Sequence, residues 1–493
     1  MNTKKKSNDL RENLAKSVNL THQCRCGFRA SDLNCRIPAI SSVGIRLAKR
    51  FKHSNMKRKF NRIRLFAIFM SIALTGHGGA FAQTVTFTTN DYSTGSNPFS
   101  VIAADVFGTG RPAIITANQA DDTVTVLGNF GNGTFASNAT YKVSSLPRAL
   151  VAADFNGDGK LDLASIGVSA TTILTNFNSG LFASNATLNV GGYAAIAFSL
   201  NGNSTSDLVI GSGGVVTVFT NNGSGTLGLN ATLPVSGIVD SMVASDVNFD
   251  GKLDLLVANE NAETNGSVMI FTNSGSGSLL SNATYFVEPQ LRAIAVADVN
   301  GDDYPDFIAG SEFGSSSPLF IWTNNGSGVF SSNATVMVAR GCLSIDAADF
   351  NGDGLTDLIA MDSADRPGIV SVVMNSSAGF GNYHTVVAGQ EPQAMAMADF
   401  NGDQKPDIVL GNAGNSITVL LNSTLFAPPP LNIVSASGNQ SVVYWKNPAP
   451  DSVLQATTNL VSPNWFTVTN GRPIQGITLS NAAPALFFRL ISQ

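Results

Sequence analysis

Five acidic loops of the sequence carry oxygen-bearing side chains at a constant spacing. The first loop begins at Asp154 and reads DFNGDGKLD, with Asp or Asn at its positions 1, 3, 5 and 9. Calcium takes about six to eight oxygen ligands, and such a loop offers three carboxylates, an amide and the backbone carbonyl of position 7. Glycine at position 6 permits the tight turn. We therefore expect about five calcium sites, with positions 1, 3, 5, 7 and 9 provided by Asp154, Asn156, Asp158, Lys160 and Asp162; Asp246, Asn248, Asp250, Lys252 and Asp254; Asp298, Asn300, Asp302, Tyr304 and Asp306; Asp349, Asn351, Asp353, Leu355 and Asp357; and Asp399, Asn401, Asp403, Lys405 and Asp407.

The loops belong to an internal repeat. Two degenerate copies begin at Asp105 and Ser199, and the seven copies follow one another at intervals of 45 to 52 residues. Each unit has short apolar and β-branched runs separated by glycine turns, and no unit keeps an apolar period of 3.6 residues. This pattern predicts an all-β chain in which each unit forms a four-stranded blade of a seven-bladed β-propeller. We expect little or no metal in the two degenerate loops.

The ends of the repeat array indicate how the ring closes. The last unit lacks an outer strand, and the segment TVTFTTNDY after residue 83 lies where that strand would precede the first unit. We expect this segment to complete the last blade and to remove its exposed edge.

The repeated motif D-x-[DN]-x-D-G-x-x-D at blade spacing resembles that of the FG-GAP/VCBS repeat family, which includes the propeller heads of integrin α subunits. The resemblance covers roughly residues 84–426 and implies calcium in the loop between the first and second strands of a blade. Asp303 and Gln404 replace glycine at position 6 of two loops, and Phe249 replaces glycine at position 4 of a third. The Gln404 loop is expected to bind metal most weakly.

The segments outside the repeats predict export and a second module. Residues 56–82 have a basic start, a short apolar run and an Ala-Phe-Ala site, which is typical of a signal peptide cleaved after Ala82. Residues 1–55 are interpreted as a non-native or disordered extension, or as an unusually long basic start of the signal. The propeller is expected over residues 83–426, a Pro-rich linker over 427–431, and a small fibronectin-like β-sandwich over 432–493. The expected product is a secreted or cell-surface bacterial monomer without a transmembrane segment.

Composition and motifs argue against several activities. The chain has 34 acidic and 29 basic residues, and most of the basic ones lie before residue 83, so nucleic acid is excluded as a partner. Beyond residue 82 the chain keeps one histidine, His384, and one cysteine, Cys342, and it has no motif of a hydrolase, metalloprotease or phosphate site. We expect no catalytic residues and no intrachain disulfide. The recurring Asn-Ala-Thr sequences are interpreted as turn residues leading into a strand, with glycosylation as the alternative.

The opposite end of the predicted ring is the candidate ligand face. The residue six positions before each loop lies at the entrance of an inner strand there, and these residues are Phe99, Arg148, Tyr193, Asp240, Arg292, Leu343 and Gln393. Seven different residues in register are typical of a binding surface, although unconstrained positions also vary. The expected function is a calcium-stabilised, non-catalytic binding or adhesion module for an extracellular protein or glycan. The alternatives are a calcium-dependent polysaccharide lyase-like enzyme and a structural part of an extracellular assembly.

Overall fold

A computed structural model describes residues 85–425, except 261–265, 313–316, 340 and 363–366, and six strands between residues 432 and 492. The predicted extension, signal peptide and linker lie outside the described residues. The described part contains β-strands and no helix, so it has no helical segment that could cross a membrane.

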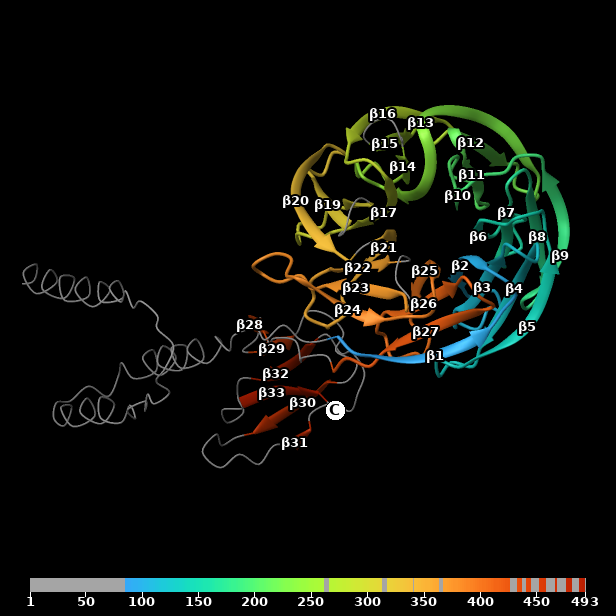
Figure 1. Cartoon of the computed structure of the whole chain (residues 1–493). Helices are drawn as coiled ribbons and strands as arrows, with labels where there is room; N and C mark the ends of the chain where they lie inside the picture. The colour runs from blue at the N-terminus through green and yellow to red at the C-terminus, as the bar shows by residue number, and fades with distance from the viewer. Residues whose placement is uncertain are drawn as a thin grey trace, which may run out of the picture. The chain divides into compact units, whose positions relative to one another are not determined.

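Consecutive strands of residues 85–425 form antiparallel meanders around a common centre (Figure 1). The innermost strands are β2 (Pro98–Ala104), β6 (Ala149–Ala153), β10 (Ala194–Phe198), the second half of β13 (Leu227–Ser245), β17 (Leu291–Ala297), β21 (Cys342–Ala348) and β25 (Pro392–Ala398). Each innermost strand contacts the next one in this order, and β25 contacts β2. The inner strands therefore form a closed ring, as in a β-propeller.

The second strands of the meanders are the most deeply buried. They are β3 (Ala113–Asn118), β7 (Asp162–Ile166), β11 (Asp207–Gly211), β14 (Asp254–Glu260), β18 (Asp306–Ser311), β22 (Asp357–Asp362) and β26 (Asp407–Asn412). The third strands are β4 (Thr123–Asn129), β8 (Thr171–Asn178), β12 (Gly213–Asn221), β15 (Ser267–Asn273), β19 (Ser317–Asn324), β23 (Ile369–Val373) and β27 (Ser416–Asn422). Because both faces of the second strands pack on neighbouring sheets, their sequences are near-continuous apolar runs rather than alternating ones.

The outer strands alternate between exposed and partly buried residues. They are β5 (Phe135–Lys142), β9 (Leu181–Leu188), the first half of β13, β16 (Leu279–Phe286), β20 (Phe330–Val338), β24 (Tyr383–Val387) and β1 (Phe87–Ser93). β1 pairs with β27 in antiparallel register from Phe87 and Asn422 to Ser93 and Ser416, which confirms that the N-terminal segment completes the last sheet.

One connection differs from the expected pattern. The 19-residue strand β13 is the outer strand beside β12 and continues, without a turn, as the inner strand beside β14. As a result β10 to β16 form one seven-stranded sheet, whereas the other meanders are four-stranded.

The hydrophobic core lies between the faces of neighbouring sheets. One cluster joins Ile115 and Val126 to Leu163 and Leu174, and another joins the first and last meanders. Stability therefore depends on contacts between successive repeats, which is typical of repeat architectures.

The C-terminal strands form two three-stranded antiparallel sheets. The first contains β28 (Asn432–Ala436), β29 (Gln440–Tyr444) and β32 (Gly476–Ser480), and the second contains β30 (Ser452–Thr457), β31 (Phe466–Thr467) and β33 (Phe487–Ser492). The predicted β-structure is present in this segment, and a sandwich of the two sheets stays a prediction.

Candidate functional site

Each acidic loop connects an innermost strand to the second strand of the same meander. The first loop, for example, follows β6 and ends at Asp162, the first residue of β7. All acidic loops therefore lie at the same end of the ring.

The aspartate at position 1 folds the loop around its own carboxylate. Asp154 accepts hydrogen bonds from the backbone N–H groups of Gly157, at 2.6 Å, and Gly159, at 2.8 Å. The other complete loops repeat this Asx-type arrangement, in which the carboxylate satisfies backbone donors of the turn. Phe249, Asp303 and Gln404 take φ angles of 60°, 67° and 65°, so these glycine replacements adopt the left-handed conformation that the turn demands.

The aspartate at position 5 has two kinds of neighbour. In three loops a lysine at position 7 approaches it, and the distance from Lys160 Nζ to Asp158 Oδ2 is 2.9 Å. A hydrogen bond from Lys160 lowers the pKa of Asp158. In the loops without this lysine the position-3 amide takes its place, as Asn300 Nδ2 donates to Asp302 Oδ2 at 2.9 Å.

The aspartate at position 9 is a buried structural brace. In the first loop, Asp162 Oδ2 accepts from the backbone N–H of Phe155 at 3.1 Å, and Asp162 Oδ1 accepts from that of Asn176 at 2.7 Å. Asp207 makes the same two bonds in a degenerate loop that begins with Ser199. This loop thus keeps position 9 although positions 1 and 5 have lost their carboxylates, whereas the loop at Asp105 keeps position 1 and has Ala113 at position 9. Burial raises the pKa of Asp306 to about 6 and those of Asp357 and Asp407 to about 7.

An asparagine at the end of the third strand links most repeats to the preceding one, and the sequence patterns did not single it out. Asn324 Nδ2 donates to the carbonyl of Val247 in the preceding acidic loop, at 2.9 Å, and to that of Pro305 in its own loop, at 3.1 Å. Equivalent bonds to the preceding loop are made by Asn129, Asn176, Asn221, Asn375 and Asn422. The signal in the sequence was an asparagine after each β-branched third strand, 22 to 27 residues beyond the start of the loop.

The complete loops have the donor chemistry of a hard-cation site, because their side chains offer only carboxylate and amide oxygens apart from lysine. In the described residues, however, no three His, Cys, Asp or Glu side chains converge as metal ligands would. The loop carboxylates point instead to backbone N–H groups and to lysine.

At the other end of the ring, the seven residues predicted as the ligand face line a single cavity of about 430 Å³. Five of them are the extra residue of a β-bulge in an innermost strand, namely Phe99, Asp240, Arg292, Leu343 and Gln393. Arg148 and Tyr193 precede β6 and β10 directly. A bulge redirects the side chain of its extra residue, which explains how these different side chains reach one cavity, here called the channel mouth.

Arg292 is the centre of a charged cluster in the channel mouth. Its guanidinium lies 2.9 Å from Glu260, 3.0 Å from Glu312 and 3.4 Å from Asp240. Burial raises the pKa of Asp240 to about 6, because the favourable effect of Arg292 does not offset the loss of water and the repulsion by Glu260 and Glu312. The sequence analysis missed both glutamates, which lie at the ends of β14 and β18 where loops vary most between repeats.

The family comparison agrees with this architecture. A model of the FG-GAP-like repeat matches residues 105–165, 200–257, 246–309 and 298–360. The chain is an FG-GAP-repeat protein. The matched ranges include the degenerate loop at Asp105, and the second range begins one residue after Ser199.

Comparisons of the FG-GAP chain with other proteins found distantly similar structures. No curated protein matched it. Two crystal structures of BBS1N in complex with ARL6DN, soaked with lead and with mercury, are each 13% identical, cover 68% of this chain and 96% of the other, and give TM-scores of 0.49. A structure of an Agrocybe aegerita lectin that recognises non-reducing terminal N-acetylglucosamine is 18% identical, with 68% and 86% covered and a TM-score of 0.44.

The Asn-Ala-Thr sequences of the FG-GAP repeats lie inside outer strands, which corrects their interpretation as turn residues. Asn138, Asn185, Asn230, Asn282 and Asn333 are each the extra residue of a β-bulge. Two of them reach the next repeat, because Asn138 and Asn230 donate to the carbonyls of Gly180 and Gly277. Periodic bulges thus provide a structural reason for the periodic sequence.

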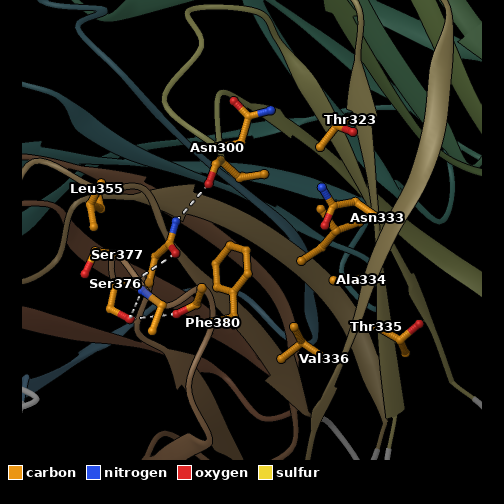
Figure 2. A pocket seen from close by; sticks show the side chains of 15 residues that line it. Asn300, Thr323, Asn333, Ala334, Thr335, Val336, Leu355, Ser376, Ser377 and Phe380 are labelled. Atoms are coloured by element: carbon orange, nitrogen blue, oxygen red, sulfur yellow. Dashed lines mark hydrogen bonds between the residues drawn. The ribbon is translucent and has the colours of Figure 1, made fainter. Parts of the chain in front are cut away.

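A second cavity, of about 560 Å³, lies beside the acidic loops between two FG-GAP repeats (Figure 2). Thr323, Asn333 and Val336 of β19 and β20 form one side, and the segment from Asn375 to Phe380 forms the other. Its lining side chains are amides, hydroxyls and apolar groups without a charge.

His384 lies in β24, and Cys342 is the first residue of β21. His384 is half-buried, like alternate residues of the outer strands, and burial lowers its pKa. The Cys342 thiol is buried, and burial raises its pKa strongly.

Proposed function

We propose that the protein is a secreted, calcium-stabilised, seven-bladed β-propeller that serves as a non-catalytic binding module for an extracellular protein or glycan. The observation that carries this proposal is the convergence of seven side chains of six residue types on the channel mouth, five of them directed there by β-bulges. Ligand sites are typically concave, with a few polar groups presented by a rigid scaffold.

The two ends of the ring would then have separate tasks. The acidic loops bind calcium and hold neighbouring blades together, and the channel mouth binds the ligand. The signal-like segment at residues 56–82 supports an extracellular location, where free calcium reaches millimolar levels suited to such loops. The lack of a catalytic motif in the sequence supports a binding role.

Screening arrays of extracellular proteins and glycans with matched variants tests the binding proposal. The double variant Phe99→Ser and Leu343→Ser changes two apolar residues of the channel mouth. We expect it to bind the ligand of the wild-type protein at least tenfold more weakly. The control is Phe130→Ser and Phe177→Ser, which changes two exposed apolar residues, Phe130 in the turn after β4 and Phe177 near the end of β8. A ligand that both double variants retain equally would contradict the assignment of the mouth, and turnover of a uronate polymer would contradict a non-catalytic role.

Thermal unfolding with excess calcium and with a chelator tests the calcium proposal. We expect about five bound ions per chain by metal analysis and a melting temperature that falls on chelation, because the carboxylates at positions 1, 5 and 9 of each loop then lose the cation bound between them. An Asp353→Asn variant should lose about one ion, while Asp121→Asn, which changes an aspartate outside the loops, should lose none. An unchanged melting temperature together with no bound metal would overturn the calcium proposal.

A further inference from the structure

The two arginines of the channel mouth have opposite electrostatic environments. Arg292 is compensated by three carboxylates. Arg148 forms no ion pair with any residue that the structure describes, and its buried Nε has no hydrogen-bond partner. An arginine that lines a cavity without a counter-ion costs desolvation free energy and favours an anionic ligand.

Arg148 is also held in a defined position. Its backbone N–H donates to the carbonyl of Ile166 at 2.8 Å, which fixes the residue at the entrance of β6. Its guanidinium carbon lies 4.8 Å from the ring centre of Tyr193, in a cation–π contact. Stacking orients the planar guanidinium without using its N–H donors, so these donors stay available for a bidentate acceptor.

The surroundings limit the kind of anion that can bind. Asp240, Glu260 and Glu312 lie in the same end of the ring and outnumber Arg292. They would repel a polymer that carries a carboxylate on every unit, whereas a ligand with one carboxylate can meet Arg148 without meeting them. The apolar side chains of Phe99 and Leu343 also line the cavity. A protein segment with one acidic side chain among neutral residues fits this distribution better than a polyuronate.

We propose that the stacked pair Arg148 and Tyr193 is the anion-binding element of the channel mouth, and that it takes the carboxylate of an Asp or Glu side chain from an extended protein segment. This inference rests on the proposed binding function and names its ligand class. Arg148 supplies the charge and two parallel N–H donors, and Tyr193 orients the guanidinium. The ion pairs of Arg292 hold the adjacent part of the cavity lining in place.

Fluorescence polarisation with two labelled peptide libraries tests the proposal on the full purified protein. The first library has one Asp or Glu among neutral residues in each hexapeptide, and the second has Asn or Gln at the same position. We expect the best acidic peptides to bind at least tenfold more tightly than their amide counterparts, with an affinity that falls as salt is raised. No difference between the libraries would overturn the proposal.

Variants of Arg148 and Tyr193, tested with the best acidic peptide, separate the effect of the arginine's charge from that of its planar geometry. Arg148→Gln should weaken binding at least tenfold. Arg148→Lys should restore only part of it, because lysine keeps the charge but not the planar fork. Tyr193→Leu should weaken it by a smaller factor of about three. Arg111→Gln is the control, because Arg111 is an exposed arginine at the acidic-loop end of the ring. Unchanged binding by Arg148→Gln would overturn the assignment.

A third measurement distinguishes failure of this inference from failure of the binding function. If oligogalacturonate binds more tightly than every acidic peptide and is lost in Arg148→Gln, the ligand class is wrong although the mouth still binds. If the ligand found on the arrays binds Arg148→Gln as well as wild type, the binding function stands and the role of Arg148 is wrong. If no array ligand depends on the mouth, the proposed function itself fails.

Discussion

Aspartates of the same loop occupy different electrostatic environments, depending on their position. At position 1 the carboxylates are half-buried and accept hydrogen bonds from backbone N–H groups, and at position 5 they contact lysine or an amide. At position 9 the carboxylate is buried, and burial raises its pKa. A pattern of residue types therefore does not by itself separate a metal ligand from a structural brace.

The buried carboxylate of Asp240 should make the stability of the protein depend on pH. Its pKa is about 6 when folded, above the ordinary value near 4, so the folded protein binds this proton more tightly than the unfolded chain. The stabilising contribution of Asp240 is therefore complete below about pH 4 and is lost as the pH rises to about 6. We expect Asp240→Asn to gain stability relative to wild type over this rise, as measured by urea unfolding at constant calcium. The control is Glu288→Gln, which changes an exposed residue. Parallel curves of unfolding free energy against pH for Asp240→Asn and wild type would contradict the prediction.

Neighbouring elements are connected by side chains that bind backbone carbonyls across the gap between sheets. In most repeats the asparagine at the end of the third strand is fixed by the position-9 aspartate of its own repeat, and its amide reaches the preceding acidic loop. The β-bulges have a related role, because they turn selected side chains of otherwise regular strands toward the channel mouth or the next repeat. The loops and strands of adjacent repeats therefore form one connected network.

Asn324→Ala tests how much the hydrogen bonds between neighbouring repeats contribute to stability. The substitution removes hydrogen bonds to the carbonyls of Val247 and Pro305 and leaves those groups without this donor. We expect a loss of about 2 kcal/mol in the free energy of unfolding, both with calcium and with chelator. The control is Asn325→Ala, which changes the exposed neighbour that bonds only within its own turn. A loss seen only with calcium would mean that the asparagine acts through metal binding.

At the scale of the whole molecule, the N-terminal strand closes the ring. β1 covers the edge of β27, and Thr86 exchanges hydrogen bonds with Ser423 and Thr424 just beyond the end of that strand. The chain ends of this part thus meet where other repeats have a short turn between the third and outer strands. An uncovered β27 would present an open edge to other chains.

Moving β1 tests closure. Deleting residues 85–93 should lower the melting temperature by about 10 °C and promote association through the edge of β27. Inserting residues 86–93 after Leu425 through a short glycine linker should restore both properties, because β27 and β1 would then form a hairpin like those of the other repeats. Differential scanning calorimetry and light scattering measure the two effects. A deletion variant as stable and monomeric as wild type would show that β1 is not needed for closure.

The sequence alone determined the features that repeat with the period of the chain. The spacing of the acidic loops, the four short strands of each unit, the role of β1 and the register of the seven mouth residues all follow from local patterns that recur. Repetition makes these patterns recognisable in the sequence, because each unit forms the same turns and strands from similar local residues.

Only the tertiary structure decided which groups meet between repeats. Arg292 meets Glu260 of the preceding sheet and Glu312 of its own sheet because the ends of these strands converge at the mouth, and Arg148 has Tyr193 rather than an acid beside it. Likewise, burial distinguished position 9 from the other aspartates, and continuous pairing made β13 one strand. Such contacts join residues that are 20 to 45 positions apart in the sequence, so charge compensation and desolvation were determined only once the ring was closed.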